Sequence, residues 1–316
     1  MAQKAPGKSH REGITLTKLI RMFPNDDAAR EWFESRIWPE GPYCPKCGSL
    51  NVQSGIRHKT MTHRCRDCEG KPRFSLKTGT IMEGSKLGYQ TWALAVYLVA
   101  TNLKGVSSMK LHRDLGVTQK TAWHLAHRIR KSLEEPEAPF SGPVEVDETY
   151  IGGKRKNMSN AKRRALRDIG RGTAGKATVI GAKDRATNSV AAQQIASTNK
   201  ATLQGFVGTH TAPGATVYTD EHGSYEGMPF EHEAVKHSAR EYVRGQAHTN
   251  GMESFWAMLK RGYNGTFHHF SEKHTGRYVT EFAGRHNMRN LDTIDQMEWI
   301  VEGMIGQRLR YPDLIA

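Results

Sequence analysis

The sequence contains no run of 18 apolar residues, and only four of its 316 residues are cysteines. Because a helix that crosses a bilayer needs about 20 mostly apolar residues, we expect no membrane span. Residues 1–11 are polar and basic and lack the apolar core of a signal peptide, so we expect a disordered tail there and no secretory leader. All four cysteines belong to one motif, which leaves none for scattered disulfides and indicates a reducing, cytoplasmic setting.

Acidic residues are scarce relative to basic ones. There are 32 Asp and Glu against 46 Lys and Arg, which gives a formal net charge of +14. This excess favours a polyanionic partner, and nucleic acid is the first candidate; the alternative is a soluble protein that is merely basic. A hydrophobic content of 37% and a charged content of 25% suit a soluble globular chain, and its length allows two or three domains with a substantial core.

Helices are predicted at both ends of the chain. The segment 12–40 contains two short amphipathic patterns, at 15–23 and 26–38, whose apolar residues recur at helical spacing. The segment 291–316 contains a third pattern, at 292–309, which predicts one C-terminal helix that packs on the core or on another protomer.

Two pairs of cysteines define a segment that we assign to residues 41–85. Each pair, Cys44 with Cys47 and Cys65 with Cys68, encloses two residues, a spacing that lets both thiolates of a tight turn face one ion. Two such turns complete a tetrahedral site for one Zn²⁺ and predict a zinc ribbon. Because four thiolates leave no open ligand position, this zinc is expected to be structural. Two disulfides or free thiols are the alternative.

Residues 86–135 are a second candidate for DNA binding. An apolar helix at 89–103 is followed by a short helix at 109–115, a turn at Gly116 and a helix at 120–133, which is the layout of a helix-turn-helix. An ordinary helical hairpin is the alternative. The last helix has a polar, mostly basic face of the kind that enters the major groove of DNA. Its residues are Gln119, Lys120, His124, His127, Arg128 and Arg130.

Three acidic residues lie in separate segments of the second half of the chain. Asp147 is at the centre of a β-branched run at 144–151, and Asp220 ends a second such run at 216–220. Glu253 lies at the start of a predicted helix. A carboxylate buried in a sheet is costly unless a cation or hydrogen bonds hold it. Three such groups in a basic chain indicate a divalent-metal site that acts on phosphate.

The order of the predicted elements in residues 142–290 indicates the fold of that domain. Two strands, at 177–182 and 189–195, follow the first acidic run, and a helix at 199–207 precedes the second. Three strands, a helix and a further strand that ends in an acid is the order of a ribonuclease H-like α/β core. In that fold the first and fourth strands are neighbours, so their carboxylates can share metal ions.

Glu253 and Lys260 are seven residues apart in the predicted helix, so both point to one side of it, as a metal ligand and a phosphate contact would require. A capping box is the structural alternative, because Asn250 precedes Glu253 by three residues. Glu148 follows Asp147 directly. Since side chains alternate along a strand, we expect Glu148 to point to the opposite face and to be structural or to contact a loop.

A basic run follows Gly152-Gly153, next to the first acidic strand. It predicts a mobile loop that holds DNA phosphates near the reaction centre, with a solvated insertion as the alternative. The residues that we expect to bind DNA are Lys154, Arg155, Lys156, Arg163 and Arg164 in this run, Arg261 in the helix after Glu253, and Lys120, His124 and Arg128 in the helix-turn-helix.

Taken in order, these motifs resemble the DDE transposases of bacterial insertion sequences, in the branch with an N-terminal zinc ribbon. The resemblance covers roughly residues 40 to 290. The matching residues are the four ribbon cysteines, Val146-Asp147-Glu-Thr-Tyr-Ile-Gly-Gly153, Tyr218-Thr-Asp220, Asn250-Gly-Met-Glu253-Ser-Phe-Trp256, Leu259-Lys260-Arg261, Thr266-Phe-His-His-Phe-Ser271 and Arg285-His-Asn287-Met-Arg289.

The resemblance implies a multi-domain protein in which a zinc ribbon and a helical, helix-turn-helix DNA-binding region precede a ribonuclease H-like catalytic core. It implies phosphoryl transfer that depends on two Mg²⁺ ions, held by Asp147, Asp220 and Glu253, with Lys260 on a phosphate. Some members of the family carry Asn at the third catalytic position, so Asn250 is an alternative to Glu253.

The activity implied by the resemblance is cleavage of double-stranded DNA at the terminal inverted repeats of an insertion sequence, followed by joining of the 3′-OH end to target DNA. It also implies more than one protomer assembled on the DNA, in the bacterial cytoplasm at the nucleoid. Two other functions fit the residues: a DNA-binding regulator without catalysis, and a nuclease of the same fold that cuts without joining.

Overall fold

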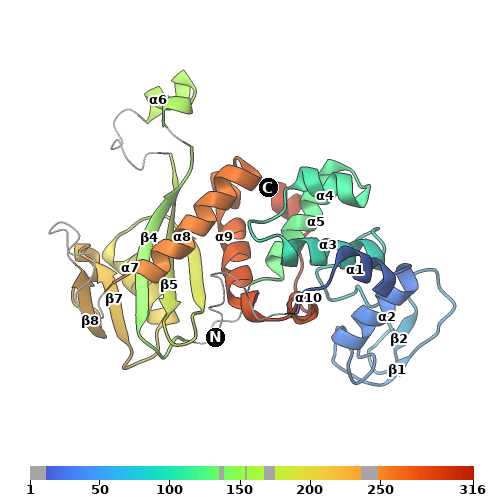
Figure 1. Ribbon diagram of the computed structural model, residues 1–316. Coiled ribbons are helices and arrows are strands. Elements are labelled where there is room, and N and C mark those ends of the chain that lie inside the picture. Colours follow the sequence, from blue (N-terminus) through green and yellow to red (C-terminus); the bar gives the residue numbers. More distant parts are fainter. Residues whose placement is uncertain (1–11, 135–138, 154, 167–174, 236–247) are drawn as a thin grey trace, which may run out of the picture. The chain divides into compact units, whose positions relative to one another are not determined.

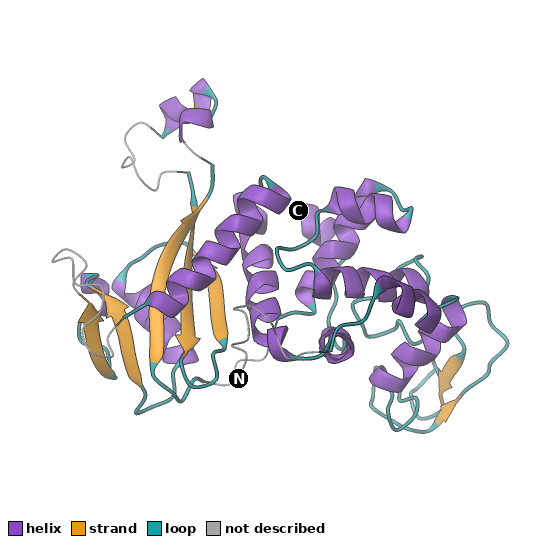
Figure 2. Cartoon of the chain, viewed as in Figure 1, coloured by secondary structure: helices purple, strands orange, loops and turns teal. Residues whose placement is uncertain are grey.

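The computed structural model describes residues 12–134, 139–153, 155–166, 175–235 and 248–316, without the side chains of Arg155 and Lys162. The chain divides into two compact units, Met1–Glu135 with Met288–Ala316, and Pro136–Asn287 (Figures 1 and 2). No helix in these ranges is long and apolar enough to cross a membrane.

The first unit is mainly helical. Four of its helices begin at a Thr, Ser or Asn whose side chain caps the helix. These residues are Thr15, Asn25, Ser107 and Thr118, and each accepts a hydrogen bond from the backbone N–H three residues later. Gly116 ends α4 in the left-handed conformation (φ +64°) and turns the chain into α5. The helices are α1 (Leu16–Met22), α2 (Asp26–Ile37), α3 (Tyr89–Thr101), α4 (Ser108–Leu115), α5 (Gln119–Lys131), α10 (Thr293–Glu302) and α11 (Tyr311–Ile315).

The C-terminal segment does not form the single helix predicted at 292–309. Helix α10 ends at Glu302, and a turn leads to the short helix α11. Gly303 lies so close to the end of α5 that an added Cβ would be 2.0 Å from the carbonyl oxygen of Ser132. The helix therefore ends where the chain meets α5, and the apolar side of α10 packs on α2 and α3.

A small antiparallel sheet lies within the first unit, between α2 and α3 in the sequence. Its order is β1 (Val52–Gln53), β2 (His63–Cys65) and β3 (Arg73–Phe74). The strands are short, and the ring of Trp38 at the end of α2 packs edge-on against His63 and Phe74 of this sheet. Cys44 and Cys65 are buried in the same core, so the cysteine-bearing turns are joined to the helical part.

The second unit is built on a five-stranded mixed sheet in the order β6-β5-β4-β7-β8. Strands β4, β5 and β6 are antiparallel, whereas β7 runs parallel to β4 and β8 runs parallel to β7. The predicted pairing of the first and fourth strands is therefore confirmed. The strands are β4 (Val144–Ile151), β5 (Ala177–Asp184), β6 (Val190–Ile195), β7 (Thr216–Asp220) and β8 (Glu231–Val235).

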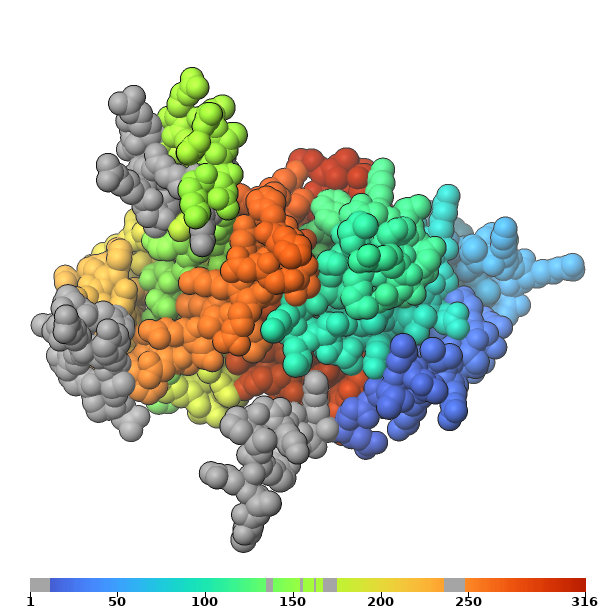
Figure 3. All heavy atoms as spheres, turned by 45° about the horizontal axis from the view of Figure 1, so that its top comes forward, coloured from blue at the N-terminus to red at the C-terminus, as the bar shows by residue number. Residues whose placement is uncertain are grey.

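Helices cover both faces of this sheet. One face packs on α7 (Lys200–His210) through Val144, Val146 and other apolar residues, and the opposite face packs on α8 (Asn250–Gly262) and α9 (Glu272–Asn287). The short helix α6 (Asn160–Ala165) is drawn beyond the end of β4, away from the sheet (Figures 1 and 3). Strand β8 and helix α9 were not predicted. The result is a mixed α/β domain consistent with a ribonuclease H-like core.

Candidate active site and metal centre

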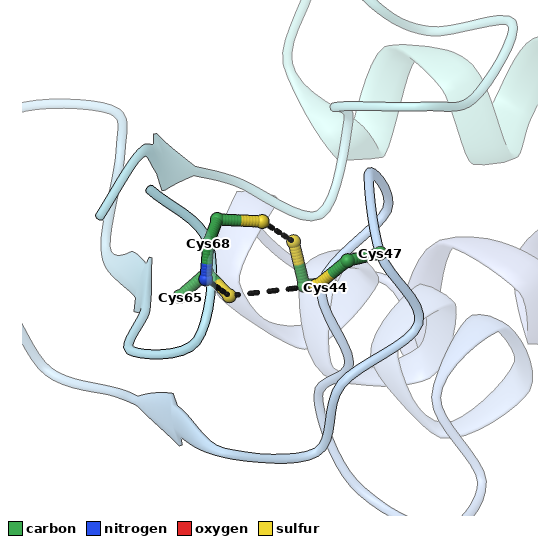
Figure 4. A group of neighbouring side chains, drawn as sticks. All are labelled: Cys44, Cys47, Cys65 and Cys68. Carbon is green, nitrogen blue, oxygen red and sulfur yellow. Dashed lines mark hydrogen bonds between the residues drawn. The ribbon is translucent and has the colours of Figure 1, made fainter. Parts of the chain in front are cut away.

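The four cysteines of the first unit form one cluster (Figure 4). The Sγ atoms of Cys44 and Cys68 are 3.8 Å apart, and those of Cys47 and Cys65 are 3.7 Å apart. Four sulfurs placed tetrahedrally about 2.3 Å from a zinc ion lie about 3.8 Å from one another, whereas a disulfide would bring two of them to about 2.0 Å. The cluster therefore fits a structural Zn²⁺ and excludes the two-disulfide alternative.

Asp147 and Asp220 meet where β4 and β7 lie side by side. The two strands are parallel, with Val144 opposite Val217 and Glu145 opposite Tyr218. Asp220 is the last residue of β7, and its Oδ1 accepts a hydrogen bond from the backbone N–H of His222 (3.0 Å). Carboxylate oxygens of Asp147, Glu148 and Asp220 all lie within 4.8 Å of one another. The pairing of the strands thus brings together two of the three predicted acids.

Glu148 is the third member of this group, so it is also a candidate metal ligand, beside the structural or loop-contacting role that we predicted for it. Alternation does send its side chain to the face opposite that of Asp147, where the buried Tyr225 donates a hydrogen bond from its hydroxyl to Glu148 Oε1. From that face the carboxylate still reaches Asp220 and Asp147. Tyr225 follows Asp220 by five residues, and no sequence pattern singles it out.

Burial and mutual repulsion perturb the acids of this group. Burial, and secondly the charge of Asp220, raises the pKa of Asp147 to about 6. Burial likewise raises the pKa of Glu148 to about 7, although the Tyr225 hydroxyl opposes this. Ionised carboxylates packed this closely need a cation, and hard oxygen donors are the ligands that Mg²⁺ prefers. The residues therefore fit a divalent-metal site.

Glu253 lies beside this group but outside it. It is exposed in the first turn of α8, and its charge contributes to the raised pKa of Asp147. The capping box does not form, because Thr249 is the N-cap and Asn250 is the first helical residue. Lys260 is exposed in the last turn of α8. Seven residues separate it from Glu253, so the two still share one side of the helix.

Helix α8 also contributes a contact that the sequence did not suggest. The indole Nε1 of Trp256 donates a hydrogen bond to Asp147 Oδ2 (3.0 Å), and the backbone N–H of Glu148 donates to the other oxygen (2.8 Å). Both bonds favour the ionised carboxylate and fix its orientation. Trp256 therefore holds Asp147 in place and is not only an apolar anchor of the helix.

The basic face predicted for DNA on α5 is largely internal. His124 Nε2 lies 3.1 Å from the carbonyl oxygen of Leu309, and Arg128 donates from Nε to that same oxygen (3.1 Å). Arg128 is only 8% exposed and donates from Nη2 to the carbonyl of Glu83 (3.0 Å). Because the C-terminal segment covers this face, these contacts do not support the assignment of His124 and Arg128 to DNA, which stays a prediction. Lys120 is exposed at the start of α5, with its ammonium 4.3 Å above the ring of Tyr311.

Removal of the Arg128 side chain should therefore lower stability more than DNA affinity. We expect Arg128→Ala to reduce the free energy of unfolding by about 1.5–3 kcal/mol, since charge-assisted bonds to two carbonyls are lost. Chemical denaturation measures this. The exposed Arg113 offers a matched control, for which the change should stay within about 0.5 kcal/mol. If Arg128→Ala leaves stability unchanged but weakens DNA binding, Arg128 is instead a DNA contact.

The basic run after β4 is described only in part. Lys154 lies outside the described residues, and Arg155 is described by its backbone alone. Lys156, Arg163 and Arg164 are exposed on η1 (Arg155–Asn157) and α6, and Arg163 donates a hydrogen bond to Asn160. Arg261 is exposed at the end of α8. These exposed side chains are available to a polyanion.

Comparison with known proteins bears on both units. The family model described as the ISXO2-like transposase domain matches residues 139–287, and the transposase zinc-ribbon domain matches residues 24–71. The chain is 28% identical over 253 residues to an uncharacterized protein in the transposable element ISH50 of Halobacterium salinarum, an alignment that covers 77% of this chain and 84% of that protein. That relative is archaeal, so the resemblance is not confined to bacteria. Both units thus match parts of transposases: the second unit is an ISXO2-like DDE transposase domain, and the first contains a transposase zinc ribbon.

Proposed function

We propose that this transposase cuts double-stranded DNA at the terminal inverted repeats of its element and joins the released 3′-OH ends to target DNA, by metal-dependent phosphoryl transfer. The observation that carries the proposal is the group of carboxylates at the junction of β4 and β7, with α8 beside it. Such a group, when ionised, concentrates negative charge that a bound divalent cation would neutralise. DNA, with its phosphates, is the substrate that such a cation and a basic chain would bind together.

In this proposal Asp147 and Asp220 hold two Mg²⁺ ions, and Glu253 closes the site, with Asn250 as the alternative third position. When bound, the ions supply Lewis-acid activation of the attacking oxygen and stabilise the leaving oxygen. The residues of the chain orient these groups. Trp256 fixes one oxygen of Asp147, and Tyr225 fixes Glu148, so that the carboxylates are in place before DNA arrives.

Exposed basic residues hold the DNA in this proposal. Lys260 steadies a phosphate next to the reacting one, from the same side of α8 as Glu253. Arg261 and the exposed residues after β4 contact the backbone further away, and Lys120 contacts it at the start of the helix-turn-helix. One Zn²⁺ on the four cysteines holds the ribbon. More than one protomer would assemble on the paired ends, since each end of an element must be cut and joined.

The test is strand cleavage and joining on a duplex that carries the element's own ends, with and without Mg²⁺. We expect metal-dependent nicks and joined products with the wild type, and neither with Asp220→Ala. Glu226→Ala removes an exposed acid six residues further on and should leave both steps intact.

Each other outcome points to a different function. Cutting without joining would indicate a nuclease of the same fold. Tight DNA binding that is unchanged in Asp220→Ala, with no cutting by either protein, would overturn the proposed catalysis and favour a regulator.

A further inference from the structure

Glu145 lies two residues before Asp147 on the same face of β4 and is buried, with 2% of its surface exposed. A buried carboxylate must be paired. Its Oε1 accepts a hydrogen bond from Arg185 Nε (2.7 Å), and its Oε2 accepts one from the backbone N–H of Met252 (3.1 Å). Met252 is in the first turn of α8. Glu145 therefore joins the strand that carries Asp147 to the helix that carries Glu253.

The bond to Met252 provides the cap that α8 otherwise lacks. The first backbone N–H groups of a helix have no partner within it, and the N-cap Thr249 makes no side-chain bond to them. Glu145 supplies an acceptor and a negative charge at the positive end of the helix. Glu253 is not used for capping, because the helix begins one residue earlier than the box that the sequence allows.

Two glycines let the helix lie close to the sheet at this point. A Cβ added to Gly251 would be 2.7 Å from Glu145 Oε2 and 3.0 Å from Lys183 Nζ. A Cβ added to Gly181 of β5 would be 2.4 Å from Met252 Cε and 2.8 Å from the ring of Trp256. A side chain at Gly251 would displace the Glu145 carboxylate, and a side chain at Gly181 would displace Met252 or Trp256 of α8.

Arg185 ties the chain that enters the helix to the same carboxylate. Its Nη2 donates to the carbonyl oxygen of His248 (2.6 Å), two residues before α8 begins. Its guanidinium also lies 4.3 Å from the ring centre of Tyr218, in β7. The pair of Glu145 and Arg185 thus contacts β4, β7 and the start of α8 together.

We propose that Glu145 is a positioning residue, which sets the depth and direction of α8 and so places Glu253 against Asp147. The inference rests on the proposed role of Glu253 at the metal site. Outer residues that orient metal ligands typically change metal affinity or activity by about 10- to 100-fold when replaced. Glu145 acts in this way through the helix and does not itself touch substrate.

The test compares Glu145→Gln, Glu253→Gln and the double variant in the full-length protein. Titration with Mn²⁺ alone, without DNA, measures metal affinity, and cleavage assays give kcat and KM. We expect Glu145→Gln to weaken Mn²⁺ binding by about 10-fold and to lower kcat with little change in KM for DNA. The double variant should be no worse than Glu253→Gln, because both changes remove the same contribution.

A matched control separates positioning from stability. Glu281 is a buried carboxylate paired with Arg285 (3.4 Å) in the same unit, on α9. Glu281→Gln should lower the melting temperature as Glu145→Gln does, but leave Mn²⁺ affinity unchanged. Gly251→Ala, which alters no charge, should reproduce the loss of Mn²⁺ affinity.

The outcomes distinguish the inference from the proposed function. If Glu253→Gln weakens Mn²⁺ binding but Glu145→Gln does not, Glu145 is only structural and the inference is overturned while the proposed function stands. Independent, multiplying effects of the two changes would also overturn it. If Glu253→Gln is silent in both readouts, the proposed role of Glu253 fails first and the positioning role fails with it.

Discussion

Asp147→Asn should abolish strand cleavage, by at least about 10³-fold, and at the same time make the metal-free protein more stable. The loss of activity follows from the loss of a ligand charge that is worth several kcal/mol in the transition state. The gain in stability follows from the position of Asp147, whose pKa is raised to about 6 by burial and by the charge of Asp220. A neutral amide of the same shape avoids the cost of burying a charge and the repulsion, but its NH2 group cannot accept one of the two hydrogen bonds that Trp256 and the backbone N–H of Glu148 donate to Asp147.

The contribution of Asp147 to the free energy of unfolding depends on pH. The pKa of Asp147 rises from its ordinary value of 3.8 to about 6 in the folded protein. The folded state thus favours the protonated acid, so this contribution to stability is complete below pH 4 and is lost as the pH rises through 6. One pKa unit corresponds to about 1.4 kcal/mol, so the loss for Asp147 is roughly 3 kcal/mol at most. Glu148, with a pKa of about 7, extends the loss to higher pH.

Thermal unfolding in magnesium-free buffer, without a chelator that would also strip zinc, measures this. At pH 8 we expect Asp147→Asn to melt a few degrees above the wild type, and at pH 4 slightly below it, because the loss of one hydrogen bond then has no relieved repulsion to offset it. Added Mg²⁺ should raise the melting temperature of the wild type but not that of the variant. The exposed Glu226 provides the control, since Glu226→Gln should melt as the wild type does at each pH. A variant less stable than the wild type at pH 8 would contradict the assigned repulsion.

Much of the structure around the two acidic strands of the second unit can be predicted from local sequence. The β-branched runs that carry Asp147 and Asp220 form β4 and β7, and the order of elements correctly predicts that the two strands pair. Spacing alone likewise gathers the cysteines, because two residues between each pair constrain a tight turn. In both cases the chain places the chemical groups on short, regular segments, for which periodicity is a sufficient guide.

The remaining contacts depend on packing between distant segments. Alternation gave the correct face for Glu148, but it could not show that the carboxylate still reaches Asp220. The polar pattern of α5 identified a face without showing that Leu309, far along the chain, covers Arg128. The capping box of Asn250 and Glu253 does not form, because the helix begins one residue earlier, and Glu145, more than 100 residues before it, accepts the bond from the Met252 N–H. A sequence pattern shows which groups can bond locally, and tertiary packing decides which bonds form.

Removal of zinc should unfold the ribbon and weaken the surrounding core of the first unit. Structural zinc sites of this kind contribute about 10 kcal/mol or more to folding, far more than this short-stranded sheet could supply. Hydrogen bonding to Cys47, together with burial, raises the pKa of Cys68 to about 12, so four thiolates do not form there without a cation. We expect one zinc ion per chain by elemental analysis, and none in Cys65→Ser.

Thiol reactivity gives a second test of the zinc site. The chain has four cysteines, all in the cluster, so a thiol reagent should find none that react quickly in the native protein and four after chelation. Cys44 and Cys65 are buried in the core that contains Phe74, so the loss of zinc should also expose aromatic rings and lower DNA binding. Ser49→Ala, which removes two exposed hydrogen bonds, one donated to Asp67 and one accepted from the backbone N–H of Asn51, should retain zinc and fold. Four rapidly reacting thiols before chelation, or an unchanged fold without metal, would show that the ribbon folds without zinc.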